Sequence, residues 1–134
     1  PYLQTKGKKA FDIHLEVSIK PEEAEETVVS KSNFKYLYWS MAQQLAHHTS
    51  NGCRVNSGDM MGSGTISGPT PDSFGSMLEL TWGGKNPIKL KDGTERKFIE
   101  DNDTVIIRGF CENAEVRLGF GEVASQLLPP FIRP

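Results

Sequence analysis

The feature that most constrains the fold is an unbroken alternation of apolar and polar residues over positions 11–19, which read Phe-Asp-Ile-His-Leu-Glu-Val-Ser-Ile. Successive side chains of a strand point to opposite faces of a sheet, so this pattern predicts a half-buried β-strand with its odd-numbered side chains facing inward. Residues 20–25 form a charged turn, and the β-branched run that follows predicts a returning strand over residues 27–30. Together the two segments predict a β-hairpin.

Strand and turn patterns also dominate the chain after residue 52. They predict strands over residues 59–67, 77–82, 104–110 and 116–120, and a hairpin that pairs residues 88–90 with residues 96–99. An Asp-Gly pair at positions 92 and 93 lies within this hairpin and is typical of a tight turn. The segment 127–134 contains three prolines and is expected to lie extended against the body.

One helix is expected, over about residues 33–48. Apolar residues recur there at three- and four-residue steps and share one face; they are Phe34, Leu37, Met41 and Leu45, followed by His48. Ser32 or Asn33 is a candidate N-cap, and Asn51-Gly52 suits the left-handed backbone that often ends a helix. The expected fold is therefore mainly β with one long helix, arranged as a β-sandwich or rolled barrel.

Composition places the chain among ordinary globular domains. It has 134 residues, the length of one domain, with 37% hydrophobic and 24% charged residues, which excludes disordered and membrane-spanning classes. The net charge of -2 argues against a nucleic-acid partner. Two cysteines, Cys53 and Cys111, are expected to be small packing residues in a reducing compartment such as the cytoplasm. A first residue of proline suggests a piece of a longer protein.

A series of motifs runs through the chain in a fixed order. Residues 32–41, Ser-Asn-Phe-Lys-Tyr-Leu-Tyr-Trp-Ser-Met, and residues 43–53 resemble the helix of the fumarylacetoacetase branch of the fumarylacetoacetate hydrolase family. Gly58-Asp59, followed by Gly-Thr-Ile-Ser-Gly at residues 64–68, resembles the Gly-Asp…Gly-Thr-x-x-Gly signature of the wider superfamily. Residues 73–80, Ser-Phe-Gly-Ser-Met-Leu-Glu-Leu, are similar to a stretch typical of the fumarylacetoacetase branch and not of the smaller acylpyruvate hydrolases. The first strand and residues 116–121 match as well, so the resemblance spans nearly the whole chain.

The resemblance implies a fold, an activity and partners. The fold is the mixed β-sandwich roll of the family's large C-terminal domain, of which residues 1–134 would be the C-terminal portion. The activity is hydrolysis of a small diketo acid, 4-fumarylacetoacetate, to fumarate and acetoacetate in tyrosine breakdown. Members of the family are homodimers that bind calcium or magnesium.

Two site residues follow from position in these motifs. Glu79 resembles the glutamate that orients a histidine general base, and Thr65 resembles the residue whose hydroxyl binds a substrate carboxylate. A carboxylate suits the first role because its hydrogen bond fixes the tautomer of an imidazole and stabilises the imidazolium. Glycines beside Thr65 would let a ligand approach the backbone. Without the motifs, Glu79 reads as a solvated strand residue and Thr65 as part of a glycine-rich strand with a bulge.

The resemblance also places much of the family's machinery outside these residues. The family's catalytic histidine, metal carboxylates and oxyanion-binding residues lie upstream of the first strand, and nothing in this chain matches them. His14, His47 and His48 are assigned no catalytic role, and the acidic residues 100, 101 and 103 resemble a turn before a late strand, not a metal site. We therefore expect this chain alone to bind no metal and to be inactive. Two alternatives stay open: another enzyme of the superfamily, such as an acylpyruvate hydrolase, and a non-catalytic β-sandwich module used for binding or assembly.

Overall fold

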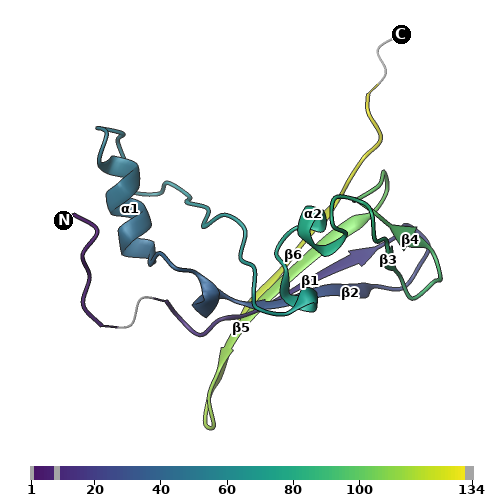
Figure 1. Cartoon of the computed structure of the whole chain (residues 1–134), viewed down its shortest axis with the longest axis horizontal. Helices are drawn as coiled ribbons and strands as arrows, with labels where there is room; N and C mark the ends of the chain where they lie inside the picture. Colours follow the sequence, from purple (N-terminus) through teal and green to yellow (C-terminus); the bar gives the residue numbers. More distant parts are fainter. Residues whose placement is uncertain (1, 8–9, 132–134) are drawn as a thin grey trace.

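The computed structural model describes residues 2–7 and 10–131, and a four-stranded antiparallel sheet dominates it (Figure 1). The strand order is β2-β1-β5-β6. The bounds are β1 His14–Lys20, β2 Thr27–Asn33, β5 Thr104–Glu112 and β6 Arg117–Gln126. The predicted hairpin and both late strands are thus confirmed, and the strand predicted over 11–19 is present from residue 14. Its expected inward face is only partly correct, because Phe11 is 62% exposed and Ser18, on the opposite face, is fully buried. The last strand runs well beyond its predicted end at residue 120.

The remaining elements are short. They are the 3-10 turns η1 Phe34–Tyr36 and η2 Pro71–Ser73, the helices α1 Met41–Thr49 and α2 Met77–Leu80, and the paired strands β3 Ile88–Lys89 and β4 Glu95–Arg96. The hairpin expected around Asp92-Gly93 is therefore present, although its strands are only two residues long. The fold is mainly β, as expected. No helix in residues 2–7 and 10–131 has the length and apolar character that crossing a membrane requires.

The single long helix over residues 33–48 is wrong. Asn33 ends β2 and caps only the short η1 turn, by accepting a hydrogen bond from the Lys35 N–H at 2.9 Å. Ser40 starts the true helix through a capping box: Gln43 N–H donates to Ser40 Oγ at 3.3 Å, and the Gln43 side chain accepts from the Ser40 N–H at 2.9 Å. These bonds satisfy the N–H groups of Ser40 and Gln43, which have no acceptor within the helix because they lie at its start. The capping box therefore fixes the beginning of the helix at Ser40. The expected end holds, since α1 stops at Thr49 and Gly52 has φ +87°.

Two predicted strands are also wrong. Residues 59–67 are irregular, and residues 77–80 form α2 although the sequence alternates. Ser76 caps α2 by accepting from the Glu79 N–H at 3.3 Å, which offers the backbone a helical turn in place of a ladder. The buried Thr81 then donates its hydroxyl to the Met77 carbonyl at 2.7 Å. Local hydrogen bonds therefore outweigh the period-two pattern, because none of the described strands pairs with this segment.

The described strands do not close into a barrel. β2 and β6 lie at opposite edges of the sheet, so the expectation of a rolled barrel is wrong for this part of the chain. The tail does not lie against the body either, because it leaves the sheet after β6 (Figure 1), and Leu128 and Phe131 are 74% and 85% exposed. Residues 132–134, the rest of that expected tail, lie outside the described residues.

A buried ion pair lies beside a small apolar core. The core joins Ile19 and Val29 of the sheet to Leu90 at the end of β3. Arg96 donates two hydrogen bonds to Asp103, at 2.9 and 3.0 Å, and Asp103 is 1% exposed. Burial raises the pKa of Asp103, but the Arg96 guanidinium and the Glu100 N–H outweigh it, so the pKa is lowered. The pair fixes the turn before β5 to the β3-β4 hairpin.

A second ionic cluster spans the strands themselves. Arg108 of β5 contacts Glu122 of β6, with Nε 2.8 Å from the carboxylate, and also binds Glu26 in the turn between β1 and β2. The guanidinium lowers the pKa of Glu26 to about 2, from an ordinary value of 4.5. One side chain therefore links three separate parts of the sheet.

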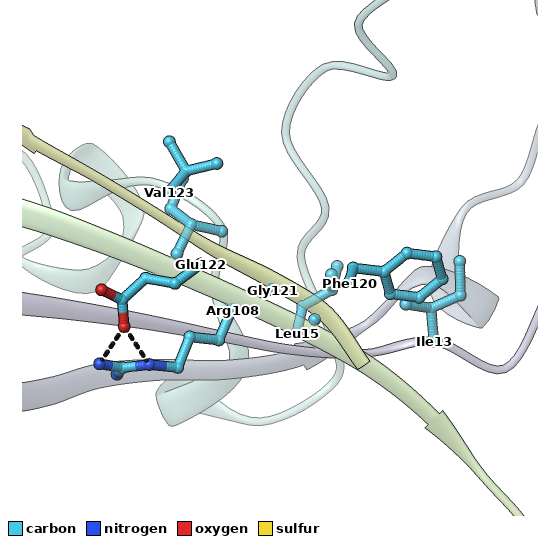
Figure 2. A pocket seen from close by; sticks show the side chains of 9 residues that line it. Ile13, Leu15, Arg108, Phe120, Gly121, Glu122 and Val123 are labelled. Atoms are coloured by element: carbon cyan, nitrogen blue, oxygen red, sulfur yellow. Dashed lines mark hydrogen bonds and ion pairs between the residues drawn. The ribbon is translucent and has the colours of Figure 1, made fainter. Parts of the chain in front are cut away.

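One face of the sheet near β6 is apolar and open. A hollow of about 280 Å³ is lined there by the residues labelled in Figure 2 and by Ile107 and Gly109. Phe120 and Val123 are 59% and 63% exposed, and all ten residues of β6 are exposed. β6 also has an unpaired edge. An exposed apolar face that continues to a free strand edge is a surface prone to association.

We predict that Arg96→Leu destabilises the protein by about 3–5 kcal/mol, because it leaves the Asp103 carboxylate buried without its cation. The double variant Arg96→Leu/Asp103→Leu is expected to lose less, since it removes both charges. Urea unfolding of wild type and both variants measures the difference. A single variant that unfolds at the same midpoint as wild type would contradict the stabilising role of this pair.

We also predict that a chain of these 134 residues self-associates through the β6 face. Val123→Lys places a charge in the hollow and is expected to shift the equilibrium toward monomer. Val116→Lys is the matched control, because Val116 is equally exposed at 63% but does not line the hollow. Sedimentation velocity over a range of concentrations measures the result. A wild-type chain that is monomeric throughout, with a cooperative thermal transition, would contradict the prediction.

Candidate functional site

The motif residues lie in two facing segments, 65–68 and 73–75, that are fixed to the edge of the sheet. The Gly68 N–H donates to the Ser73 carbonyl at 2.8 Å, which joins the segments to each other. Two serines of β2 join them to the sheet: Ser30 Oγ donates to the Phe74 carbonyl at 2.7 Å, and Ser32 Oγ donates to the Ile66 carbonyl at 3.0 Å. An otherwise irregular loop is therefore held in place by strand side chains.

Close approach of the segments depends on two glycines. A Cβ at position 75 would lie 2.7 Å from the Ile66 carbonyl oxygen and 2.7 Å from Thr65 Cγ2. A Cβ at position 68 would lie 2.5 Å from Ser73 Oγ. The space beside Gly68 is thus filled by the protein's own side chains. Gly64, by contrast, has open space where a Cβ would stand.

Glu79 lies in the first turn of α2, half-buried, and not on a strand. Ser67 Oγ donates to both of its carboxylate oxygens, each at 2.9 Å, and Ser76 Oγ donates to Oε2 at 2.8 Å. The Gly75 N–H donates in turn to Ser67 Oγ at 3.1 Å. The description of Glu79 as a freely solvated strand residue is therefore wrong. Its carboxylate is held from two sides by hydroxyl groups.

An apolar wall stands beside this carboxylate. Phe74, Leu78 and Trp82 line, together with Glu79, a hollow of about 380 Å³. Trp82 has φ +51°, a left-handed conformation that costs a bulky residue energy, on the order of 1–3 kcal/mol. Residues in such conformations cluster at functional sites. Trp82 is also 66% exposed, so burial of its side chain does not offset the cost of this backbone conformation.

Thr65 lies in the same loop cluster and is exposed. Its methyl group faces Gly75, whose N–H is bonded to the serine that holds Glu79. Its hydroxyl makes no hydrogen bond to any residue that the structure describes and is free to bind a ligand. The structure thus brings Thr65 and Glu79, fourteen positions apart in the sequence (79 − 65), into one loop cluster.

The three histidines lie outside this loop cluster. His14 stacks on Phe110, with ring centroids 4.8 Å apart, and His47 and His48 occupy the last turn of α1. Cys53 is exposed, so its expected packing role is wrong, whereas Cys111 is half-buried; both are free thiols.

The described residues do not fit a divalent metal. Within 2–7 and 10–131, no group of three or more His, Cys, Asp or Glu side chains is placed to hold an ion. Asp103 is bound to Arg96 in the turn before β5, as expected of that acidic segment.

Sequence reasoning missed three residues of the site. Ser76 had a detectable signal, since Ser-x-x-Glu at positions 76–79 is a helix-start pattern that the alternation obscured. Ser67 is a variable position of the Gly-Thr-x-x-Gly signature and carries no pattern of its own. Trp82 was assigned to a strand, where its left-handed backbone could not be foreseen.

Comparison with known proteins identifies the family of this chain. Residues 3–127 match the family model described as fumarylacetoacetate (FAA) hydrolase C-terminal. Fumarylacetoacetase of Dictyostelium discoideum is 53% identical over 131 residues, which are 96% of this chain and 31% of that protein. The human and Arabidopsis thaliana fumarylacetoacetases are 50% and 48% identical, over 98% and 96% of this chain and 32% and 31% of those proteins. The chain thus spans about a third of the length of the curated relatives it matches, and it belongs to the fumarylacetoacetate hydrolase family through that family's C-terminal region.

Proposed function

We propose that residues 1–134 are the C-terminal portion of a fumarylacetoacetase, which hydrolyses the C–C bond of 4-fumarylacetoacetate to give fumarate and acetoacetate. The single observation that carries this proposal is the carboxylate of Glu79, held by Ser67 and Ser76 beside an open apolar hollow. The bond to Ser76 belongs to the cap of α2, whereas the bond to Ser67 comes from a separate segment of the loop cluster. The proposed substrate follows from the name of the relatives, which are fumarylacetoacetases about half identical in sequence to this chain.

Hydrolysis of a diketone requires water activated by a general base and positive groups around the oxyanion that forms. Glu79 would orient the base, an imidazole contributed by residues outside this chain. A carboxylate offers about four acceptor positions, and the two hydroxyl groups supply only two protons. The remaining capacity can accept an imidazole N–H. Glu79 would then hold the imidazole tautomer and stabilise the imidazolium as water loses its proton.

Thr65 would bind a carboxylate of the substrate through its free hydroxyl. The neighbouring Gly64 has no described atom within 4 Å of where a Cβ would stand, so the backbone there is open to solvent. Such a contact exists both before and during the reaction, so it contributes mainly to binding.

The rest of the full-length protein would complete this site. The divalent cation of the family, calcium or magnesium, would be held by residues outside the described part of the chain. The full-length protein would be a cytoplasmic homodimer in which this sheet forms part of a mixed β-sandwich roll. Such a roll would cover the open face beside β6.

We predict that a chain of these 134 residues binds neither calcium nor magnesium with sub-micromolar affinity, because its described side chains offer no cluster of ligands. Isothermal titration calorimetry with each chloride salt measures this directly. Tight binding of one ion per chain would contradict both the prediction and the assignment of the metal to other residues.

For the full-length enzyme we predict that Glu79→Gln and Thr65→Val act on different kinetic constants. Glu79→Gln keeps the shape but removes the charge that stabilises the imidazolium, so kcat is expected to fall by about 10²–10⁴ with little change in KM. Thr65→Val removes a contact present in ground and transition states alike, so KM is expected to rise first. Steady-state kinetics with fumarylacetoacetate separates the two.

Near-normal turnover of Glu79→Gln would remove Glu79 from the catalytic machinery. Wild-type enzyme that fails to hydrolyse fumarylacetoacetate would overturn the proposed function itself. Thermal unfolding of each variant serves as the control, and both are expected to melt close to wild type, since neither side chain belongs to the apolar core.

A further inference from the structure

The hydroxyl of Ser67 is the meeting point of the two loop segments and the candidate catalytic carboxylate. It accepts a hydrogen bond from the Gly75 N–H at 3.1 Å and donates to Glu79 Oε1 and Oε2, both at 2.9 Å. A hydroxyl carries one proton. Because the Gly75 N–H occupies an acceptor position of this oxygen, the proton is left to point between the two carboxylate oxygens.

The backbone around Ser67 is fixed on both sides. The preceding carbonyl, that of Ile66, accepts from Ser32 on β2, and the following N–H, that of Gly68, donates to Ser73. Gly75 is held as well, since the carbonyl of Phe74 before it accepts from Ser30 on β2. The position of the Ser67 hydroxyl is therefore determined by the edge of the sheet and does not depend on Glu79.

Ser76 cannot replace this contact. Its hydroxyl reaches only Oε2 of Glu79, at 2.8 Å, and it lies on the same short helix as the glutamate. A single contact to one oxygen leaves the carboxylate free to turn about its last torsion, which is intrinsically broad in glutamate. A shared proton between both oxygens restricts that torsion, and with it the direction in which the remaining acceptor positions point.

We infer that Ser67 is a positioning residue that orients the Glu79 carboxylate toward the imidazole base. This inference rests on the proposed function. Ser67 would not touch the substrate or the reacting atoms; it would act only through Glu79. Misplacement of a catalytic group by about 1 Å can lower a rate by about 10²-fold, so loss of this contact has a measurable kinetic effect.

The test is a double-mutant cycle in the full-length enzyme, with wild type, Ser67→Ala, Glu79→Gln and the double variant. Ser67→Ala is expected to lower kcat about 10- to 100-fold and to leave KM within about threefold. In the Glu79→Gln background the same change is expected to lower kcat by less than about threefold, because the group through which Ser67 acts has already been altered. A merely structural role of Ser67 would instead give the same loss in both backgrounds.

Ser63→Ala is the matched control, since Ser63 is an exposed serine of the same loop whose hydroxyl is bonded only to the Gly64 carbonyl. It is expected to retain wild-type kcat and KM. If Ser67→Ala does not fold, Ser67→Cys carries the same test, because a thiol has similar size but is a weak donor.

The outcomes separate the role of Ser67 from the proposed function. Wild type without hydrolase activity overturns the proposed function, and this inference with it. Active wild type, an impaired Glu79→Gln variant and a Ser67→Ala variant with normal kcat overturn the role of Ser67 alone. Equal losses from Ser67→Ala in both backgrounds also overturn it.

Discussion

The pairing of β1 with β5 is the interaction on which the rest of the structure depends. The two strands pair without interruption from His14 opposite Phe110 to Lys20 opposite Thr104, although most of the chain separates them in sequence. β2 pairs with β1, and two serine hydroxyls of β2 bind the loop of the candidate site. β5 carries β6 and follows the turn held by Asp103. The candidate site is therefore attached to a central pairing that it does not itself touch.

Strong dependence on that one pairing has an energetic reason. The apolar core of buried side chains is small, built around Ile19, Val29 and Leu90. Ionic contacts supplement it, with Arg96 bound to Asp103 at one end of β5 and Arg108 bound to side chains of two neighbouring segments in its middle. The open face near β6 shows that much of the apolar surface of the sheet is not covered by the described residues.

The strands could be predicted from the sequence because an alternation of apolar and polar residues matches the period-two geometry of a strand, although burial does not follow it: all ten residues of β6 are exposed. The helix could be predicted only in kind. Phe34 and Leu37 fit the helical spacing, but the capping box of Ser40 and Gln43 fixes the start six residues later than Phe34 allows, counting from 34 to 40. The strand predicted over residues 77–82 is wrong for a related reason. None of the described strands pairs with this segment, and the capping Ser76 favours a helical turn there.

Much of the site could be located from motifs, yet its internal contacts could not. Thr65 and Glu79 stand in recognisable patterns, and the structure places them in one loop cluster. Their hydroxyl partners come from tertiary contacts, which no spacing rule records. The serines of β2 are an example: in the sequence they are ordinary polar residues of an alternating strand, and only the fold turns their hydroxyls toward two loop carbonyls.

The contact between Arg108 and Glu26 also makes the stability of the folded sheet depend on pH. In the unfolded chain a glutamate takes up a proton near pH 4.5, whereas in the folded protein Glu26 stays charged until about pH 2. Between these values acid is bound preferentially by the unfolded chain, so each step downward in pH favours unfolding. Above pH 4.5 the contribution of Glu26 is fully present. The ion pair between Glu26, in the turn before β2, and Arg108, in the middle of β5, is thus fully formed near neutral pH and is lost only in strong acid.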